Sequence, residues 1–208
     1  MRPAWKPKLR GVSHGVAFVL ACVGTAALWS SPLAGARLYA AAMAAMFGAS
    51  ALLHLPNWSD AGHQVLRRVD HCAIFLAIAA TYTPYALLEA HDTVGLWAMW
   101  SFAAIGALLS IAWLGMPRTL RALLYVVMGL CTTPLLVRLP SVIGWPGVLA
   151  HAGAAVLYIG GAAVWARRWP DPSPRVFGFH EVFHLLVIGG ALCQYAVLLS
   201  LSSPASAR

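Results

Sequence analysis

Long apolar runs alternate with short polar stretches along the whole chain. Seven of the runs are long enough to cross a bilayer, because a spanning helix needs about 20 mostly apolar residues. They cover roughly residues 11–30, 36–55, 69–90, 95–115, 119–139, 144–166 and 178–201. Prolines and charged residues separate them, as in the stretch 56–68. The pattern predicts an all-α fold, a seven-transmembrane helix bundle that forms a single domain over residues 1–208.

The composition supports a multi-pass membrane protein. Hydrophobic residues make up 61% of the 208 residues and charged residues 10%, whereas a soluble domain is about half apolar and a quarter charged. So few charges cannot cover a water-soluble globule of this size. The four cysteines are far apart within apolar runs, which predicts packing residues and not a disulfide framework. The first run leads directly into further spans, so we expect it to be a retained helix and not a cleaved signal.

The basic residues are distributed unevenly between the two sides of the predicted bundle. Eleven fall on the side of the N-terminus: Arg2, Lys6, Lys8, Arg10, Arg67, Arg68, Arg118, Arg121, Arg167, Arg168 and Arg175. Three fall on the other side: Arg37, Arg138 and Arg208. Positive charge accumulates in cytoplasmic loops, so the N-terminus is predicted to be cytoplasmic and the C-terminus outside. This also explains the net charge of +8 without nucleic acid, for which the chain has no aromatic and basic patch.

Four chemically active side chains are predicted to meet near the cytoplasmic face. His54 ends the second span, Asp70 begins the third, and His180 and His184 begin the seventh. Residues at i and i+4 share one helix face, so His180 and His184 can bind one metal ion together. His54 would supply a third nitrogen, and three protein ligands with one open position are typical of catalytic zinc. The pattern therefore predicts a Zn²⁺ site.

Two further residues suit hydrolytic chemistry at this site. Asp70 is placed to accept a hydrogen bond from a water molecule that zinc activates. Ser50 lies one turn before His54 and shares its face, although it also suits close packing between helices. The other histidines are interpreted as interfacial or hydrogen-bonded residues: His14, His63, His71, His91 and His151. Among these, His14 and His71 are kept as candidate accessory residues.

Two other kinds of site remain open. Residues 180–184 match HExxH, the motif of zinc proteases, in which Glu181 would be the general base. From Leu185 to Arg208 there is no Asp, Glu or His, so the third ligand would again have to come from upstream. Glu181 is therefore retained as an accessory candidate. The second alternative is haem held by paired histidines on different helices.

The sequence resembles the haemolysin III family, whose relatives are the progestin and adipoQ receptors and, more distantly, the alkaline ceramidases. The resemblance covers nearly the whole chain. It rests on Ser13-His14, Ser50-Ala51-Leu52-Leu53-His54, Arg67-Arg68-Val69-Asp70-His71, Ile78-Ala79-Ala80-Thr81-Tyr82-Thr83-Pro84, Tyr158-Ile159-Gly160-Gly161 and His180-Glu181-Val182-Phe183-His184. One departure is Gln194, where many members are expected to have a histidine.

The resemblance implies a seven-helix bundle with a cytoplasmic N-terminus, with zinc bound by His54, His180 and His184. It places Asp70 and Ser50 beside the metal and its water. We expect the protein to lie in the cell inner membrane. Ceramidase-like relatives hydrolyse a lipid amide, so we expect either a zinc-dependent hydrolase of lipid amides or esters, or a non-enzymatic protein. The latter would permeabilise membranes (cytolysis) or regulate membrane homeostasis, with structural zinc. Membrane lipids are the expected partners in both cases.

Overall fold

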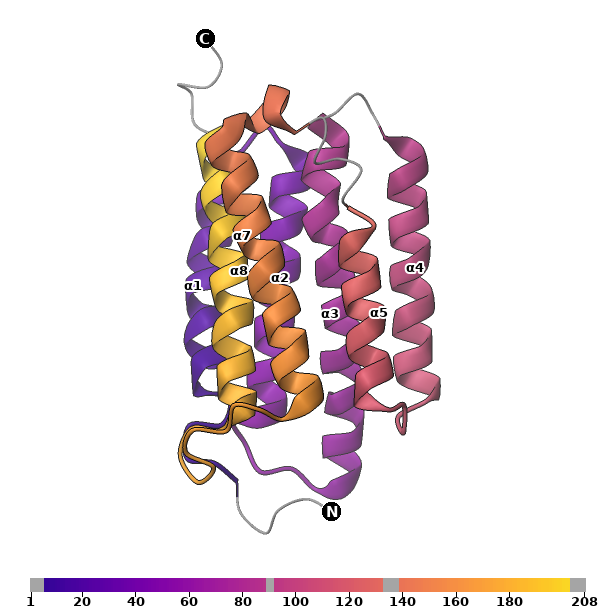
Figure 1. The fold of residues 1–208 in the computed structure, drawn as a ribbon, viewed down its shortest axis with the longest axis vertical. Coiled ribbons are helices and arrows are strands. Elements are labelled where there is room, and N and C mark those ends of the chain that lie inside the picture. The colour runs from indigo at the N-terminus through magenta and orange to yellow at the C-terminus, as the bar shows by residue number, and fades with distance from the viewer. Residues whose placement is uncertain (1–5, 89–91, 133–138, 203–208) are drawn as a thin grey trace.

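The computed structural model describes residues 6–88, 92–132 and 139–202, which form mainly helices (Figure 1). The described helices are α1 Val12–Trp29, α2 Ala34–His54, α3 Asp60–Leu88, α4 Thr93–Ala112, α5 Arg118–Leu130, α7 Pro140–Arg167 and α8 Phe179–Ser202. In these ranges the only β-type pairing is an isolated bridge between Ser173 and Phe177. The prediction of an all-α fold is confirmed. Four residues used in the sequence argument lie outside the described ranges: Arg2, His91, Arg138 and Arg208.

Six of these helices are long and apolar enough to cross a membrane, namely all except α5. Their outer faces carry large apolar side chains. On α4, Val94 is 82% exposed and Trp97 71%, and on α7 Leu149 and Val156 are each 70% exposed. Broad apolar outer surfaces of this kind mark membrane contact. The described residues therefore form a helical membrane bundle.

Helix α5 is shorter than the predicted span 119–139. It runs for 13 residues and ends at Leu130. Part of the predicted span, residues 133–138, lies outside the described ranges. The seventh crossing therefore stays a prediction.

Helix α3 begins nine residues before the predicted start of its span at residue 69. The hydroxyl of Ser59 accepts a hydrogen bond from the backbone N–H of Gly62 at 3.2 Å, which satisfies one of the free donors of the first turn. Asp60, in the stretch 56–68 that separates two predicted spans, is thus in the first turn of α3. A hydropathy pattern detects only the apolar part of a helix, so the polar turns of α3 were missed.

The kink in α7 explains where the sixth predicted span begins. Gly144 has non-helical backbone angles, with φ of 66° and ψ of 168°, and Pro146 follows it. Such a positive φ is readily adopted only by glycine. The regular helix continues after Gly144, in agreement with the predicted start at residue 144.

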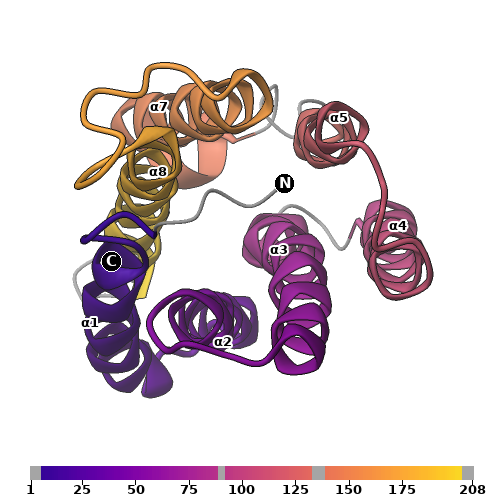
Figure 2. The same ribbon diagram turned by 90° about the horizontal axis from the view of Figure 1, so that it is seen from below.

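Six helices surround the centre of the bundle, and α4 lies outside them (Figure 2). The order around the centre is α1, α2, α3, α5, α7 and α8, and each helix packs against the next. Helix α8 also packs against α1, so the first and last helices of the chain are neighbours. Helix α4 packs against α3 and α5. This arrangement turns one face of six helices toward a shared interior.

Replacing Gly35 by alanine is expected to destabilise the bundle by about 1–3 kcal/mol through overpacking. A Cβ at residue 35 would lie 2.5 Å from the Cα of Pro84, and this backbone atom cannot move without separating α2 from α3. Gly160→Ala is the matched control, because a Cβ there meets nothing within 4 Å. Thermal unfolding in detergent measures the effect. Equal unfolding temperatures for the two variants would contradict the close contact.

Candidate metal centre

The predicted site residues gather at the end of the bundle where α1 and α8 begin and α2 ends, the lower end in Figure 1. We call it the histidine end, because histidines of α1, α2 and α8 meet there. His54 is the last residue of α2, and His180 and His184 lie in the first two turns of α8. Helix α1 contributes His14. The convergence that the sequence predicted for the three candidate ligands is present in the structure.

His54, His180 and His184 form the histidine cluster. Their candidate ligand nitrogens all lie within 4.8 Å of one another. The Nε2 atoms of His54 and His180 are 3.1 Å apart, and two nitrogens bound to one tetrahedral zinc ion would be about 3.3 Å apart. His184 Nδ1 is buried without a hydrogen-bond partner. The spacing and the all-imidazole donor set fit a zinc ion.

His14 belongs to the same network, although the sequence gave it only an accessory place. Its ring stacks on that of His184, with 3.5 Å between centroids and 6° between planes. Its Nδ1 lies 2.7 Å from the Oγ of Ser50. His14, Ser50 and His184 are all buried. Ser50 is therefore a hydrogen-bonding residue of the site and not only a packing residue between helices.

Asp70 joins this network from α3. Its side chain is 8% exposed, and its carboxyl group is close enough to interact with the Ser50 hydroxyl. A path of contacts thus runs from His184 through His14 and Ser50 to Asp70. It places the carboxyl group close to the histidine cluster without making it part of the group of nearby ligand atoms.

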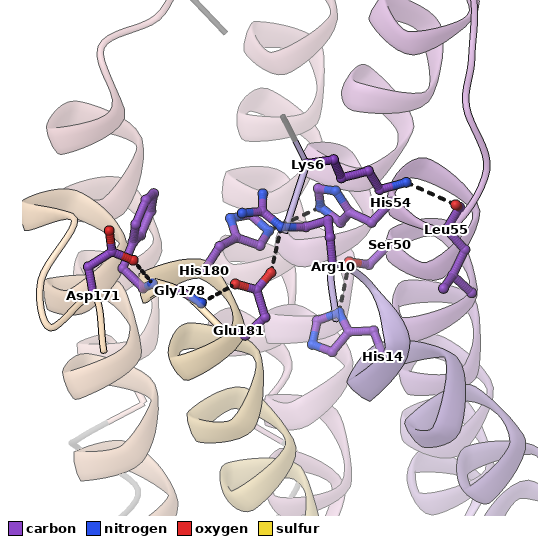
Figure 3. A network of polar contacts seen from close by, with 11 residues as sticks. Lys6, Arg10, His14, Ser50, His54, Leu55, Asp171, Gly178, His180 and Glu181 are labelled. Atoms are coloured by element: carbon purple, nitrogen blue, oxygen red, sulfur yellow. Dashed lines mark hydrogen bonds and ion pairs between the residues drawn. The ribbon is translucent and has the colours of Figure 1, made fainter. Parts of the chain in front are cut away.

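Glu181 has a structural position that differs from the one the HExxH motif would require. Its carboxylate accepts a hydrogen bond from Arg10 Nε at 2.5 Å and another from the backbone N–H of Gly178 at 2.7 Å (Figure 3). The side chain of Glu181 is 1% exposed. It therefore caps the start of α8 and pairs with a cation from the N-terminal segment, so both carboxylate oxygens are engaged away from a role as general base.

The N-terminal segment 6–11 is held across the histidine end. Its hydrogen bonds join Lys8 N–H to Arg175 O, Leu9 N–H to Val176 O, and Lys6 Nζ to Leu55 O. Gly11 has φ of 84°, and a Cβ there would lie 2.7 Å from the Cβ of His54. Only glycine allows this segment to pass so close to the histidine cluster. Charge counting alone gave no sign of this role.

His71 and Arg121 form a separate contact between α3 and α5. Arg121 Nη1 donates to His71 Nδ1 at 2.5 Å, and the hydroxyl of Tyr125 donates to the backbone oxygen of His71. Arg121 is 1% exposed. Arg121 falls within the predicted span 119–139, and it lies in the first turn of α5 with its side chain inside the bundle, a burial that the charge count did not indicate.

Gln194 lies in a second polar network. It receives a hydrogen bond from the hydroxyl of Tyr85 and lies 3.0 Å from Nδ1 of His151. It is ten residues beyond His184 on α8, about 15 Å along the helix axis. The glutamine is therefore remote from the histidine cluster.

A cavity of about 1170 Å³ connects these groups. It is lined by parts of six helices and by the N-terminal segment. The histidine cluster, Asp70 and Ser50 lie on its wall, and so does Gln194. The cavity is larger than many small-molecule sites, which are about 300–1000 Å³. It has room for a long amphipathic molecule whose polar part reaches the histidine cluster.

The fold and the site define a multi-pass helical membrane protein with a histidine cluster facing an internal cavity. Comparison with known families identifies it further: the family model described as "Haemolysin-III related" matches residues 4–195. The chain therefore belongs to the haemolysin III family, which confirms the resemblance drawn from its motifs.

Two curated relatives are similar to this chain over most of their length. The chain is 26% identical over 169 residues to the "Hemolysin-3 homolog" of Bacillus subtilis (strain 168), an alignment that covers 78% of this chain and 74% of the relative. It is 24% identical over 200 residues to "Hemolysin-3" of Bacillus cereus, covering 90% of this chain and 88% of the relative. The similarity thus extends over most of the bundle.

Proposed function

We propose that the protein is a seven-span inner-membrane hydrolase that binds zinc through His54, His180 and His184 and cleaves lipid amides or esters. The uneven distribution of basic residues supports a cytoplasmic N-terminus. The histidine end would then face the cytoplasm and the C-terminus would lie outside. The observation that carries the proposal is the meeting of three imidazoles, a buried carboxyl group and a hydroxyl group on the wall of one large cavity.

Bound zinc would supply Lewis-acid activation of a carbonyl group and of water. Asp70 is positioned to take a proton from the attacking water and to pass it to the departing amine or alcohol. The new bond joins the water oxygen to the carbonyl carbon, and the C–N or C–O bond of the lipid breaks. Ser50 would help to orient the Asp70 carboxyl group, and His14 Nδ1 lies within hydrogen-bonding distance of the Ser50 hydroxyl. The apolar length of the cavity would accept the acyl chain.

Asp70→Asn tests this function. We expect turnover to fall by about 10²- to 10⁴-fold, the contribution of a general base, while zinc content stays at the wild-type level. The assay is release of fatty acid from a panel of long-chain amides and esters, measured by mass spectrometry on zinc-loaded protein in detergent. Asp60→Asn is the matched control, because Asp60 is an exposed carboxylate on the same helix that does not line the cavity. Full turnover in Asp70→Asn would remove Asp70 from the mechanism.

A non-enzymatic function is the second candidate, and the names of the two relatives favour it. In this case zinc would be structural and would join α2 to α8, which are far apart in the sequence. The protein would permeabilise the membrane or adjust its state. Zinc removal would then lower the unfolding temperature and change leakage from vesicles, with no lipid product formed at any zinc concentration.

A further inference from the structure

The wall of the cavity carries a strong excess of positive charge. Among the described residues that line it, six are basic: Lys6, Arg10, Arg67, Arg118, Arg121 and Arg168. The same set of lining residues contains a single acidic one, Asp70. The accumulation of Lys and Arg on the cytoplasmic side of membranes explains why these residues lie at one end of the bundle. It does not explain why they line a cavity. A charged cavity of one sign concentrates ligands of the opposite sign.

Among these six residues, Arg121 is the one that the preference of basic residues for cytoplasmic loops explains least, because it is buried. It is 1% exposed, and it donates hydrogen bonds to two neutral acceptors, His71 at 2.5 Å and Ser110 at 3.4 Å. A buried charge is costly unless an opposite charge accompanies it. Asp70 is near enough for its charge to act on Arg121, but this one carboxyl group also belongs to the network of Ser50. The charge of the arginines therefore exceeds what the wall itself can balance.

Arg118 lies one turn before Arg121 on α5 and adds a second guanidinium group. It is 5.6 Å from the ring centroid of Trp165 and donates to the backbone oxygen of the same residue at 3.4 Å. These partners are also neutral. Arg118 and His180 of the histidine cluster line the same cavity. Arg10 differs from both, because the carboxylate of Glu181 balances it.

We propose that Arg121 and Arg118 bind the phosphate of an anionic lipid at the histidine end of the cavity. A guanidinium group offers paired N–H donors that match two phosphate oxygens, and the apolar part of the cavity would take the acyl chains. The ligand class is therefore a phosphate-bearing lipid and not a neutral one. Its role as substrate rests on the proposed hydrolase function, whereas the binding itself does not.

Binding of three probes to the full chain in non-ionic detergent tests the proposal. The probes are dioctanoyl phosphatidic acid, dioctanoylglycerol, which has the same chains without the phosphate, and inorganic phosphate. We expect the phosphatidic acid to bind at least tenfold more tightly than the other two, as measured by calorimetric titration. Equal affinity for the two lipids, or competition by inorganic phosphate at the same concentration as the lipid, would overturn it.

Substitutions of single arginines test whether the lipid phosphate binds at Arg121 and Arg118. Arg121→Gln should reduce the preference for phosphatidic acid at least tenfold, Arg121→Lys should restore part of it, and Arg118→Gln should weaken it. Arg68→Gln is the matched control, because Arg68 donates to the backbone oxygen of Ile111 and does not line the cavity. An unchanged preference in both folded glutamine variants of α5, or an equal loss in Arg68→Gln, would contradict the assignment.

A double variant of the histidine cluster tests the phosphate site independently of the proposed hydrolase function. His180→Ala/His184→Ala should keep the preference for phosphatidic acid, because the arginines are intact. Loss of the preference in that variant alone would place the phosphate on the metal and overturn the arginine site. Retained binding in a protein that releases no product would leave the arginine site standing while the hydrolase function fails.

Discussion

Replacing His180 and His184 together by alanine is expected to reduce the metal content from about one zinc per chain to nearly none. Two of the three nitrogens of the histidine cluster would be lost, and a single imidazole does not hold zinc against detergent purification. The unfolding temperature should fall as well, because a ligand that binds only the folded state stabilises it. Elemental analysis of purified protein measures the first effect and thermal unfolding the second.

His151→Ala is the control for the zinc measurement. His151 is also an intramembrane histidine on the cavity wall, but it pairs with Gln194 and lies outside the histidine cluster. The His151→Ala protein should therefore keep about one zinc per chain. A wild-type protein without zinc, prepared without chelators, would remove the hydrolase mechanism, and the non-enzymatic function would then be preferred.

Replacing Glu181 by alanine is expected to destabilise the protein by about 3–5 kcal/mol, the usual cost of breaking a buried ion pair by removing one partner. The change leaves Arg10 without its carboxylate and the N–H of Gly178 without its acceptor. Arg10→Ala should cost less, because the side chain of Arg10 is 20% exposed against 1% for Glu181. Thermal unfolding of both single variants and of the double variant gives the coupling between them.

A second substitution of Glu181 distinguishes a structural role of its carboxylate from a catalytic role. Glu181→Gln should lower the unfolding temperature but leave the turnover of folded, zinc-loaded protein within a few-fold of wild type. Full stability with abolished turnover would be the reverse result. It would restore the alternative in which Glu181 acts as the general base of a zinc protease.

The sequence predicted those parts of the fold that depend mainly on long apolar runs. Apolar runs located α1, α2, α4 and α8 to within a few residues, because lipid contact requires apolar side chains along the whole span. The same signal missed the first turns of α3, which are polar and stabilised by a cap at Ser59. At α5 it predicted a full span over residues 119–139, whereas the described helix has 13 residues and ends at Leu130.

The candidate site was predictable only where spacing along one helix decides the geometry. His180 and His184 share a face of α8 by periodicity, and topology brought His54 to the same end. The contact of Arg10 with Glu181 depends on the closing of the ring of helices, which no local pattern encodes. The count of basic residues on each side of the membrane used Arg121 only as evidence of orientation, because such a count does not show which side chains are buried.

The neighbouring positions of α1 and α8 have a consequence for biosynthesis. Arg10 and Glu181 are 171 residues apart in the sequence, and His14 stacks on His184 across a similar separation. A nascent chain whose last helix is still in the ribosome has neither the ion pair nor two of the three clustered histidines. The centre can therefore form only after the start of α8 has been synthesised. Chains that terminate before α8 would enter the membrane without the histidine cluster, which would assemble in a single step once α8 has joined α1 and α2.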